Sequence, residues 1–226
     1  MRVTWLGQAG LLFNKNGYQI MIDPYLSDSI GALNPCKRRT FPVDEKVLKN
    51  RPDIMIFTHD HLDHFDPDTA KIFLHENSGV TVLSPCSVWE KVRLFPGKHN
   101  CVMLNPGTTW TENNLRITAV KAEHSDPKAI GVILDDGEKK YYVTGDTLYN
   151  EAIFSQLPED IYAVFLPVNG QGNNMNMTDA ANFGKRLGAK FIVPIHYGLF
   201  DSINIDTFNV SNKITLKLFE EMEISL

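Results

Sequence analysis

The residues best suited to chemistry stand in one heptapeptide, Thr58-His59-Asp60-His61-Leu62-Asp63-His64, which holds three of the seven histidines of the chain. His59 and His61 are two residues apart, so on a strand end or tight turn their imidazoles can point the same way, and the next turn brings Asp63 and His64 toward an adjacent point. Imidazole nitrogens and carboxylate oxygens bind borderline divalent metals. Because the segment follows an apolar strand predicted over residues 53–57, it has the rigid support that a metal site requires. The heptapeptide therefore predicts metal ligands rather than a solvated polar turn.

Three more ligand-type residues each follow a predicted apolar strand: His124 after residues 115–121, Asp146 after 140–144 and His196 after 190–194. Loops at strand ends commonly build active sites. Taken singly, each of these residues is more often structural, and Gly145-Asp146 is also ordinary turn chemistry. Together with the heptapeptide, they supply the six or seven ligands that two metal ions need.

The ordered series His59-x-His61-x-Asp63-His64, His124, Asp146 and His196 resembles the signature of the metallo-β-lactamase fold and spans most of the chain. The resemblance implies an α/β (α+β) fold, a four-layered αββα sandwich with its ligands on loops at one edge of the two sheets. It also implies the ligand sets: His59, His61 and His124 for one metal, Asp63, His64 and His196 for the second, and Asp146 between them. Asp23 matches an acidic position that supports a metal-binding histidine, with an ordinary turn before Pro24 as the alternative.

Within that superfamily, three segments resemble the ascorbate 6-phosphate lactonase-like hydrolases. They are residues 5–10, residues 172–178, and Leu187-Gly188-Ala189-Lys190 leading to Pro194-Ile195-His196-Tyr197. The related lipid phosphodiesterase-like hydrolases share much of this pattern. Two features depart from it: Gln8 stands where related proteins often carry a histidine, and the lactonase has a longer N-terminal region. The resemblance thus implies the metal site and leaves the substrate open.

Two divalent cations that share a water lower its pKa toward about 7, which yields a bridging hydroxide nucleophile without a protein base. The chain has no Gly-x-Ser-x-Gly motif for a serine nucleophile. The hypothesis is therefore a metal-dependent hydrolase of an ester-like bond. The resemblance to the lactonase-like hydrolases implies a lactone or phosphorylated sugar lactone as its substrate, and two zinc or manganese ions. Asp63 and His196 are the expected catalytic residues, with Asp63 assisting proton transfer. Two alternatives stay open: a phosphodiesterase or nuclease with the same metals, and a metal-binding protein without catalysis.

Polar and basic residues elsewhere are candidates for substrate contacts. Four of them flank the last ligands and either hydrogen-bond the substrate or cap turns: Asn169, Asn173, Asn174 and Tyr197. Lys37, Arg38 and Arg39 form the densest positive charge, inside a polar stretch from Pro24 to about Asp44. A long stretch without periodicity is commonly a functional lid. Its basic cluster is either a solvated surface or a contact for an anionic substrate.

The elements that must position these residues can be read from apolar runs and turn signals. An antiparallel meander is expected over residues 3–6, 11–14 and 18–22, with a hairpin turn at Asn16-Gly17. Further strands are expected at residues 80–83, 101–104, 130–134, 162–166, 214–218 and 223–226. One helix should cover residues 66–75 with Pro67 in its first turn, a second should be capped by Thr178 with Asp179 in its first turn, and a short one should lie near Asp206.

Composition limits the remaining possibilities. The 226 residues show no repeat or long linker, so a single domain over residues 1–226 is expected. A net charge of −5 gives no general attraction for nucleic acid. Three cysteines without a C-x-x-C pattern indicate a reducing compartment. The chain has no apolar run of membrane-spanning or signal-peptide length. We therefore expect a cytoplasmic protein that acts on a small molecule and has no membrane partner; a homo-oligomer stays open.

Overall fold

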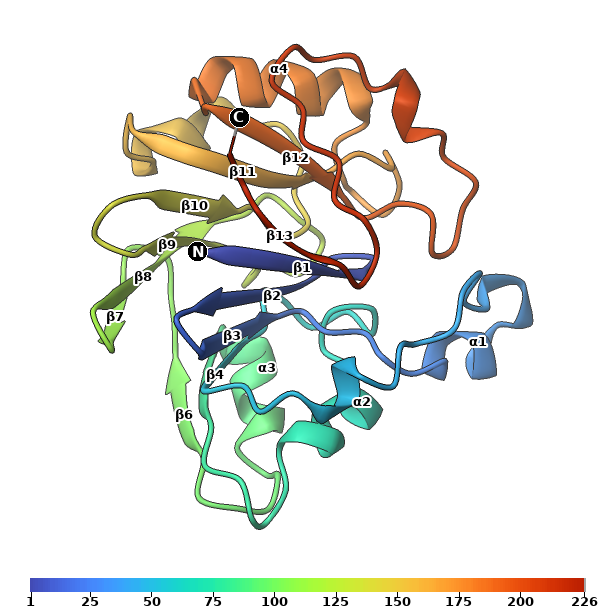
Figure 1. Ribbon diagram of the computed structural model, residues 1–226, viewed down its shortest axis with the longest axis vertical. Helices are drawn as coiled ribbons and strands as arrows, with labels where there is room; N and C mark the ends of the chain where they lie inside the picture. The colour runs from blue at the N-terminus through green and yellow to red at the C-terminus, as the bar shows by residue number, and fades with distance from the viewer. Residues whose placement is uncertain (226) are drawn as a thin grey trace.

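The computed structural model describes residues 1–225, whose strands form two β-sheets that lie face to face, with helices on the outer faces (Figure 1). The strands are β1 (Arg2–Gly7), β2 (Gly10–Lys15), β3 (Tyr18–Ile22), β4 (Ile54–Ile56), β5 (Thr81–Ser84), β6 (Asn100–Met103), β7 (Thr109–Glu112), β8 (Leu115–Lys121), β9 (Ile130–Asp135), β10 (Lys140–Val143), β11 (Ile161–Pro167), β12 (Phe191–Ile195) and β13 (Glu221–Glu223). The α-helices are α1 (Ser29–Leu33), α2 (Pro67–Phe73), α3 (Cys86–Val92) and α4 (Met177–Leu187). Short 3-10 helices are η1 (Pro35–Lys37), η2 (Val47–Lys49), η3 (Glu151–Gln156) and η4 (Ile205–Thr207).

Helices α2 and α3 cover the outer face of one sheet and α4 covers the outer face of the other (Figure 1). This confirms the αββα layering of the metallo-β-lactamase fold. The first sheet has the order β13-β1-β2-β3-β4-β5-β6 and the second β12-β11-β10-β9-β8-β7. The meander β1–β3 is antiparallel, and its Asn16-Gly17 turn takes positive φ values of 54° and 92°, as the hairpin prediction requires.

Side chains of the first sheet point alternately into two hydrophobic cores, one between the sheets and one beneath the helices. Ile20 and Ile22 of β3 belong to the core between the sheets, whereas Met21 belongs to the core beneath the helices. Successive residues of a strand point to opposite faces, so a sheet covered on both sides is apolar in every position. Helices α2 and α3 contribute the buried side chains Ala70, Phe73, Val88 and Val92 to the second core. The central strands are thereby rigid supports for the loops that leave them.

Capping residues set where the two predicted helices begin. Asp66 accepts hydrogen bonds from the backbone N–H groups of Asp68 and Thr69, and Pro67 opens α2, which confirms that start. The predicted cap of α4 was wrong, because Asn176 in extended conformation accepts from the N–H groups of Thr178 and Asp179. Thr178 is already helical there. Asp179 lies in the first turn of α4 as predicted.

Other segments differ from the predictions. Residues 214–218 form no strand, because this part of the chain touches the sheets only through isolated bridges such as that of Leu218 to Trp5. The last strand is β13 (Glu221–Glu223), and residue 226 of the predicted final strand lies outside the described residues. The polar stretch from Pro24 to Asp44 contains α1 and η1. Within residues 1–225, no helix combines the length and apolar character needed to cross a membrane.

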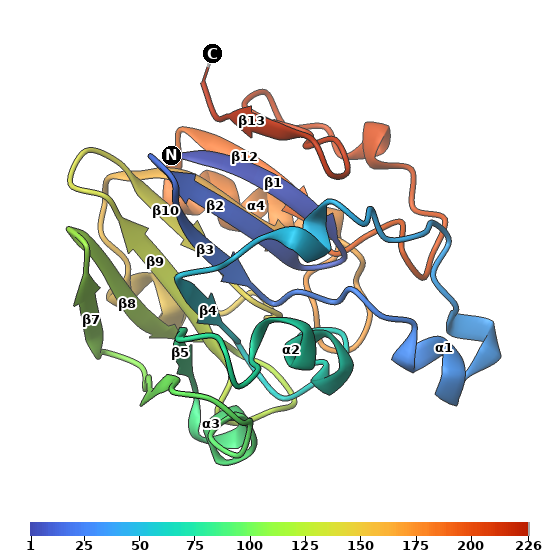
Figure 2. The same ribbon diagram turned by 60° about the horizontal axis from the view of Figure 1, so that its bottom comes forward.

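The strand directions bring the ligand loops together. Strands β8 and β10 are both antiparallel to β9, and β10, β11 and β12 are parallel, so β8, β10 and β12 end at the same edge of their sheet. His124, Asp146 and His196 follow these three strands, and the heptapeptide follows β4 of the facing sheet. Four loops therefore meet at one edge of the sandwich (Figure 2).

Candidate metal centre

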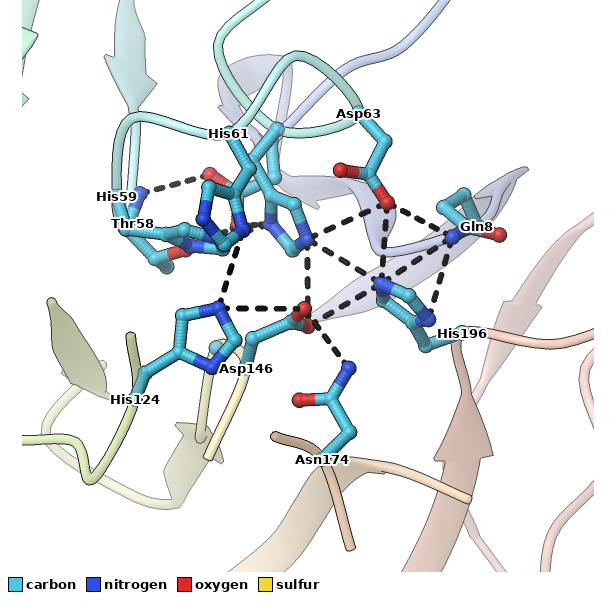
Figure 3. Close-up of polar contacts among 12 residues, drawn as sticks. Gln8, Thr58, His59, His61, Asp63, His124, Asp146, Asn174 and His196 are labelled. Atoms are coloured by element: carbon cyan, nitrogen blue, oxygen red, sulfur yellow. Dashed lines mark hydrogen bonds and ion pairs between the residues drawn. The ribbon is translucent and has the colours of Figure 1, made fainter. Parts of the chain in front are cut away.

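The structure brings all seven predicted ligands into two adjacent groups (Figure 3). The first group contains His59, His61, His124 and Asp146, and the second contains Asp63, His64 and His196. Within each group, one nitrogen or oxygen from every residue lies within 4.8 Å of those of the others. His59 and His64 are fully buried, whereas His61 and Asp63 are partly exposed. The groups are thus held in the protein interior and open on one side.

Asp146 connects the two groups through its two carboxylate oxygens. Oδ1 lies 3.2 Å from Nε2 of His64 and 3.2 Å from Nε2 of His196, both in the second group. Oδ2 faces the first group, 3.9 Å from Nε2 of His124. A carboxylate with one oxygen toward each group is suited to bridge two cations.

The spacing of these atoms fits metal ions. Zinc–nitrogen bonds of about 2.0–2.1 Å at tetrahedral angles place ligand atoms roughly 3.3–3.4 Å apart. In the second group, Nε2 of His64 and Nε2 of His196 are 3.3 Å apart, and Nε2 of His196 lies 3.3 Å from Oδ2 of Asp63. In the first group, Nε2 of His59 is buried without a hydrogen-bond partner among the described residues. A metal ion would supply what this nitrogen lacks.

A buried carboxylate orients the ligand His64. Nδ1 of His64 lies 2.8 Å from Oδ2 of Asp23, so Nε2 is the nitrogen that faces the second group. Thr58 donates its backbone N–H and its hydroxyl to the same carboxylate of Asp23. Asp23 has a φ of 44°, a left-handed conformation that aspartate tolerates better than most residues. Asp23 therefore lies where the resemblance implied.

Two side-chain amides hold the metal-facing carboxylates. Gln8 donates from Nε2 to Oδ2 of Asp63 at 2.9 Å, and its backbone oxygen accepts the N–H of His196 at 2.8 Å. Asn174 donates from Nδ2 to Oδ2 of Asp146 at 2.8 Å. Both amides are buried, and the carbonyl oxygen of each has no partner within residues 1–225. In the sequence, Gln8 was noted only because related proteins often carry a histidine at this position. Its contacts with Asp63 and His196 are visible only in the tertiary structure.

Asp126, which the sequence analysis did not single out, ties two ligand loops together. Its Oδ2 accepts the backbone N–H of Asp60, between His59 and His61, at 3.2 Å, and the hydroxyl of Ser87 at 2.7 Å. Lys91 of α3 forms an ion pair with the carboxylate of Asp60 at 2.6 Å. Because Asp126 is two residues beyond His124, this network fixes the loop of the first two ligands against the loop of the third. The sequence could have indicated this role only through the position of Asp126, an acidic residue two positions after His124.

Histidines and carboxylates in the second group and Asp146 shift each other's pKa values. Burial alone would lower the pKa of His64 and of His196, but the surrounding carboxylates, Asp146 first among them, outweigh it. The pKa of His64 therefore lies well above its usual value, and that of His196 is raised to about 9. Burial would raise the pKa of Asp63 and Asp146, yet the neighbouring imidazolium charges hold both pKa values below their usual range. In the metal-free protein, the two protonated histidines thus offset part of the negative charge of the carboxylates around them, Asp146, Asp23 and Asp63.

In the first group, the pKa values of His59 and His124 are lowered instead. Burial, followed by the charge of His64, lowers the pKa of His59 well below its usual value. Burial also lowers the pKa of His124, whose Nδ1 donates to the backbone oxygen of Asn173 at 3.2 Å. Nε2 of His124 then carries the lone pair, as a metal ligand requires, and lies 3.1 Å from Nδ1 of His61 and 3.9 Å from Oδ2 of Asp146.

A cavity of about 210 Å³ opens onto the centre. Its lining residues are Gln8, Lys37, His61, Asp63, Asp146, Asn169, Gln171, Gly172, Asn174, His196, Phe200 and Asp201. The suggested substrate contacts Lys37, Asn169 and Asn174 are thus at the cavity. Tyr197 instead stacks near Trp5, with ring centroids 4.9 Å apart.

Three other suggested contacts lie elsewhere. Asn173 meets the centre through its backbone oxygen rather than its side chain. Arg38 pairs with Asp28 at 3.0 Å. Arg39 donates from Nη1 to the backbone oxygen of Tyr25 at 2.7 Å. The structure therefore does not bring the basic cluster to the cavity as a unit.

Comparison with known proteins agrees with this geometry. A family model described as "Beta-lactamase superfamily domain" matches residues 18–197. A UPF0173 metal-dependent hydrolase of Exiguobacterium sp. is 30% identical over 219 residues, which cover 91% of this chain and 90% of the relative.

Two solved structures share the fold. Igni18, a metallo hydrolase from Ignicoccus hospitalis, is similar with a TM-score of 0.77 and 20% identity over 99% of both chains. An isothiocyanate hydrolase from Delia radicum gut bacteria is similar with a TM-score of 0.74 and 18% identity, over 100% of this chain and 99% of its own. At such identities, these structures establish the shared fold alone.

Proposed function

Because the chain belongs to the beta-lactamase superfamily domain family and to the UPF0173 metal-dependent hydrolases, we propose that it hydrolyses an ester-like bond, in the first instance a lactone, in a small molecule. The observation that carries the proposal is Asp146, whose two oxygens face two separate groups of ligand atoms. A site for one cation would need only one of these groups. The arrangement therefore supports a centre for two divalent ions.

The candidate ligands would divide into one set for each ion. His59, His61 and His124 would hold one cation and Asp63, His64 and His196 the other, with Asp146 between them. When bound, two such ions supply a nucleophilic water at neutral pH and stabilise the negative charge that develops on the attacked group. Imidazole-rich ligand sets suit zinc, and the carboxylates also suit manganese.

Asp63 is the residue placed to move a proton. Its carboxylate lines the cavity, and His64 and His196 hold its pKa below the usual range, so it is ionised at neutral pH. Gln8 holds Oδ2 of that carboxylate and leaves its other oxygen unconstrained by this bond. We propose that Asp63 takes the proton of the attacking water and returns it to the leaving oxygen.

The cavity supports a small substrate. A volume of about 210 Å³ suits a compact molecule and is below the usual size of drug-binding pockets. Asn169 and Asn174 line the cavity, and their amides are candidates to orient such a substrate. A phosphodiesterase with the same metals is the reaction that the test must distinguish.

The test begins with elemental analysis of protein purified without added metal, followed by reconstitution with zinc or manganese. The reconstituted protein should bind about two ions per chain and hydrolyse members of a lactone panel faster than a chromogenic phosphodiester. Asp63→Asn and His196→Ala should remain folded and lose turnover. Undiminished turnover in either variant would refute the assigned site, and faster cleavage of the phosphodiester would refute the lactone substrate.

A further inference from the structure

The three consecutive basic residues of the polar stretch end in three different environments. Arg38 is neutralised by Asp28, with Nη1 3.0 Å from Oδ2. Arg39 is partly buried, donates to the backbone oxygens of Tyr25 and Phe41, and has its guanidinium 5.5 Å from the centre of the Tyr25 ring. Lys37 alone lines the cavity of the metal centre. Only one of the three cations is therefore available to a molecule bound there.

The segment that carries Lys37 is attached to the loop after β12 on one side. Before Lys37, the side chain of Asn34 caps η1 by accepting the N–H of Cys36 at 3.1 Å, a bond within the segment. After it, the backbone N–H of Thr40 donates to Leu199 at 3.1 Å, and its hydroxyl donates to the backbone oxygen of Gly198 at 2.6 Å. Figures 1 and 2 both show this segment beside the chain that follows β12. Thr40, three residues after Lys37, is thus held against Gly198 and Leu199, which follow His196 in the chain.

The charges around the cavity leave Lys37 without a partner. The other charged side chains of the lining, apart from histidines, are the carboxylates of Asp63, Asp146 and Asp201. The first two are engaged with the histidines, and Oδ1 of Asp201 accepts the backbone N–H groups of Gly198 and Ile203 at 2.9 and 3.0 Å. Lys37 forms no ion pair with any residue in the range 1–225. Within residues 1–225, Lys37 is therefore the cation of the cavity lining that no carboxylate neutralises.

We propose that Lys37 binds an anionic group, a phosphate or a second carboxylate, at the end of the substrate away from the scissile bond. This inference rests on the proposed function for the position of that bond. A lysine ammonium binds such groups as a point charge and with three donors. The enzyme therefore selects acidic small molecules over neutral ones of the same size.

The test measures binding, so it does not depend on turnover. Calorimetry on the zinc-reconstituted protein compares D-gluconate, D-glucarate and D-gluconate 6-phosphate, which share one carboxylate and differ in a second anionic group. Lys37→Gln should weaken binding of at least one doubly anionic ligand about tenfold and that of gluconate less than about twofold, whereas Lys37→Arg should retain the wild-type preference. Loss for the phosphate alone or for glucarate alone identifies the group that is recognised.

Arg38→Gln is the matched control, because it removes the same charge one residue away at a side chain that does not line the cavity. It should leave all three affinities within about twofold of the wild type. Equal weakening of all three ligands by Lys37→Gln overturns the inference, as does wild-type protein that binds neither doubly anionic ligand more tightly than gluconate. A protein that recognises these ligands through Lys37 and cleaves no lactone refutes the proposed reaction and leaves this binding site standing.

Discussion

The side-chain amide of Gln8 donates a 2.9 Å hydrogen bond from Nε2 to Oδ2 of Asp63, a carboxylate of the candidate metal centre. Asn174 makes the equivalent bond to Asp146 at 2.8 Å. Each metal-facing carboxylate is thus oriented by a neutral amide whose own carbonyl oxygen lacks a partner in the described part of the chain. An unsatisfied buried acceptor costs about 1–3 kcal/mol. That cost is consistent with amides retained for the geometry of the centre rather than for stability.

Replacement of Gln8 by leucine should impair the centre while the fold is kept. The variant removes the amide that orients Asp63 and keeps a side chain of similar size, so metal affinity or kcat should fall by about 10–100-fold. Chelator competition and steady-state kinetics measure the two effects. Gln171→Leu is the control, because Gln171 lines the same cavity and has no hydrogen bond to either carboxylate. Equal effects from both variants would contradict the role given to Gln8.

Asp23→Asn should weaken the hold on one cation. The asparagine tolerates the left-handed backbone at this position but lacks the negative charge that faces Nδ1 of His64, so affinity for the ion of the second group should fall about 10–100-fold. Titration with zinc should then resolve one tight and one weakened site. Asp53→Asn makes the same chemical change at a carboxylate that caps the backbone of Gln19 instead. A variant that keeps two tight sites would show that Asp23 does not support the metal.

Metal affinity should rise with pH. The pKa of His196 is raised to about 9 and that of His64 lies well above its usual value, so both imidazoles are protonated at neutral pH and must release their protons to bind a cation. Each displaced proton makes the affinity rise about tenfold per pH unit below the raised pKa, and the part of the rise due to His196 should level off above about pH 9. Competition with a chelator between pH 6.5 and 8 measures this slope. A flat profile would mean that these protons are absent.

The same raised pKa has the opposite consequence for the stability of the metal-free protein. Since the pKa of His196 is higher in the folded state than in the unfolded chain, its contribution is fully present below about pH 6.5 and is lost as pH rises through about 9. Bound metal removes the proton and therefore this dependence. Denaturant unfolding of metal-free and zinc-loaded protein at pH 7 and 9 should show a larger decrease for the metal-free form. Equal decreases would count against the assignment.

Glu112→Gln should lower stability and leave the metal centre intact. Glu112 of β7 accepts hydrogen bonds from the hydroxyl of Tyr18, the hydroxyl of Thr81 and the indole N–H of Trp110, which join the two sheets at an edge. Burial would raise the pKa of Glu112, but these three bonds outweigh it and lower that pKa. The contribution is therefore present above about pH 4.5 and is lost at lower pH. Loss of the charged acceptor should reduce the free energy of unfolding by about 1–3 kcal/mol, with zinc stoichiometry unchanged.

The residues of the candidate metal centre could be selected from the chain because their chemistry is local. His59, His61, Asp63 and His64 are adjacent in sequence, and His124, Asp146 and His196 each follow an apolar strand. A strand that must be buried places the next residues at a sheet edge, so the neighbourhood of these side chains follows from the pattern. The layering follows for the same reason. The start of α4 does not follow from residue types alone, because Asn176 and Thr178 are both good N-caps. The extended backbone at Asn176 makes that residue the cap.

Tertiary structure alone decided which atoms face each other. Residues 138 positions apart, Gln8 and Asp146, enter one cavity, and the orientation of the Asp146 carboxylate depends on where Asn174 and the histidines come to lie. Three adjacent basic residues looked equivalent along the chain, yet Arg38 and Arg39 are used by internal partners and Lys37 is left at the cavity. Side-chain direction depends on φ and ψ and on distant contacts, whereas residue type and spacing carry only chemistry and local periodicity. The sequence by itself therefore determined that the protein can bind metal, and the fold decided how the carboxylates are held and which charge remains for a substrate.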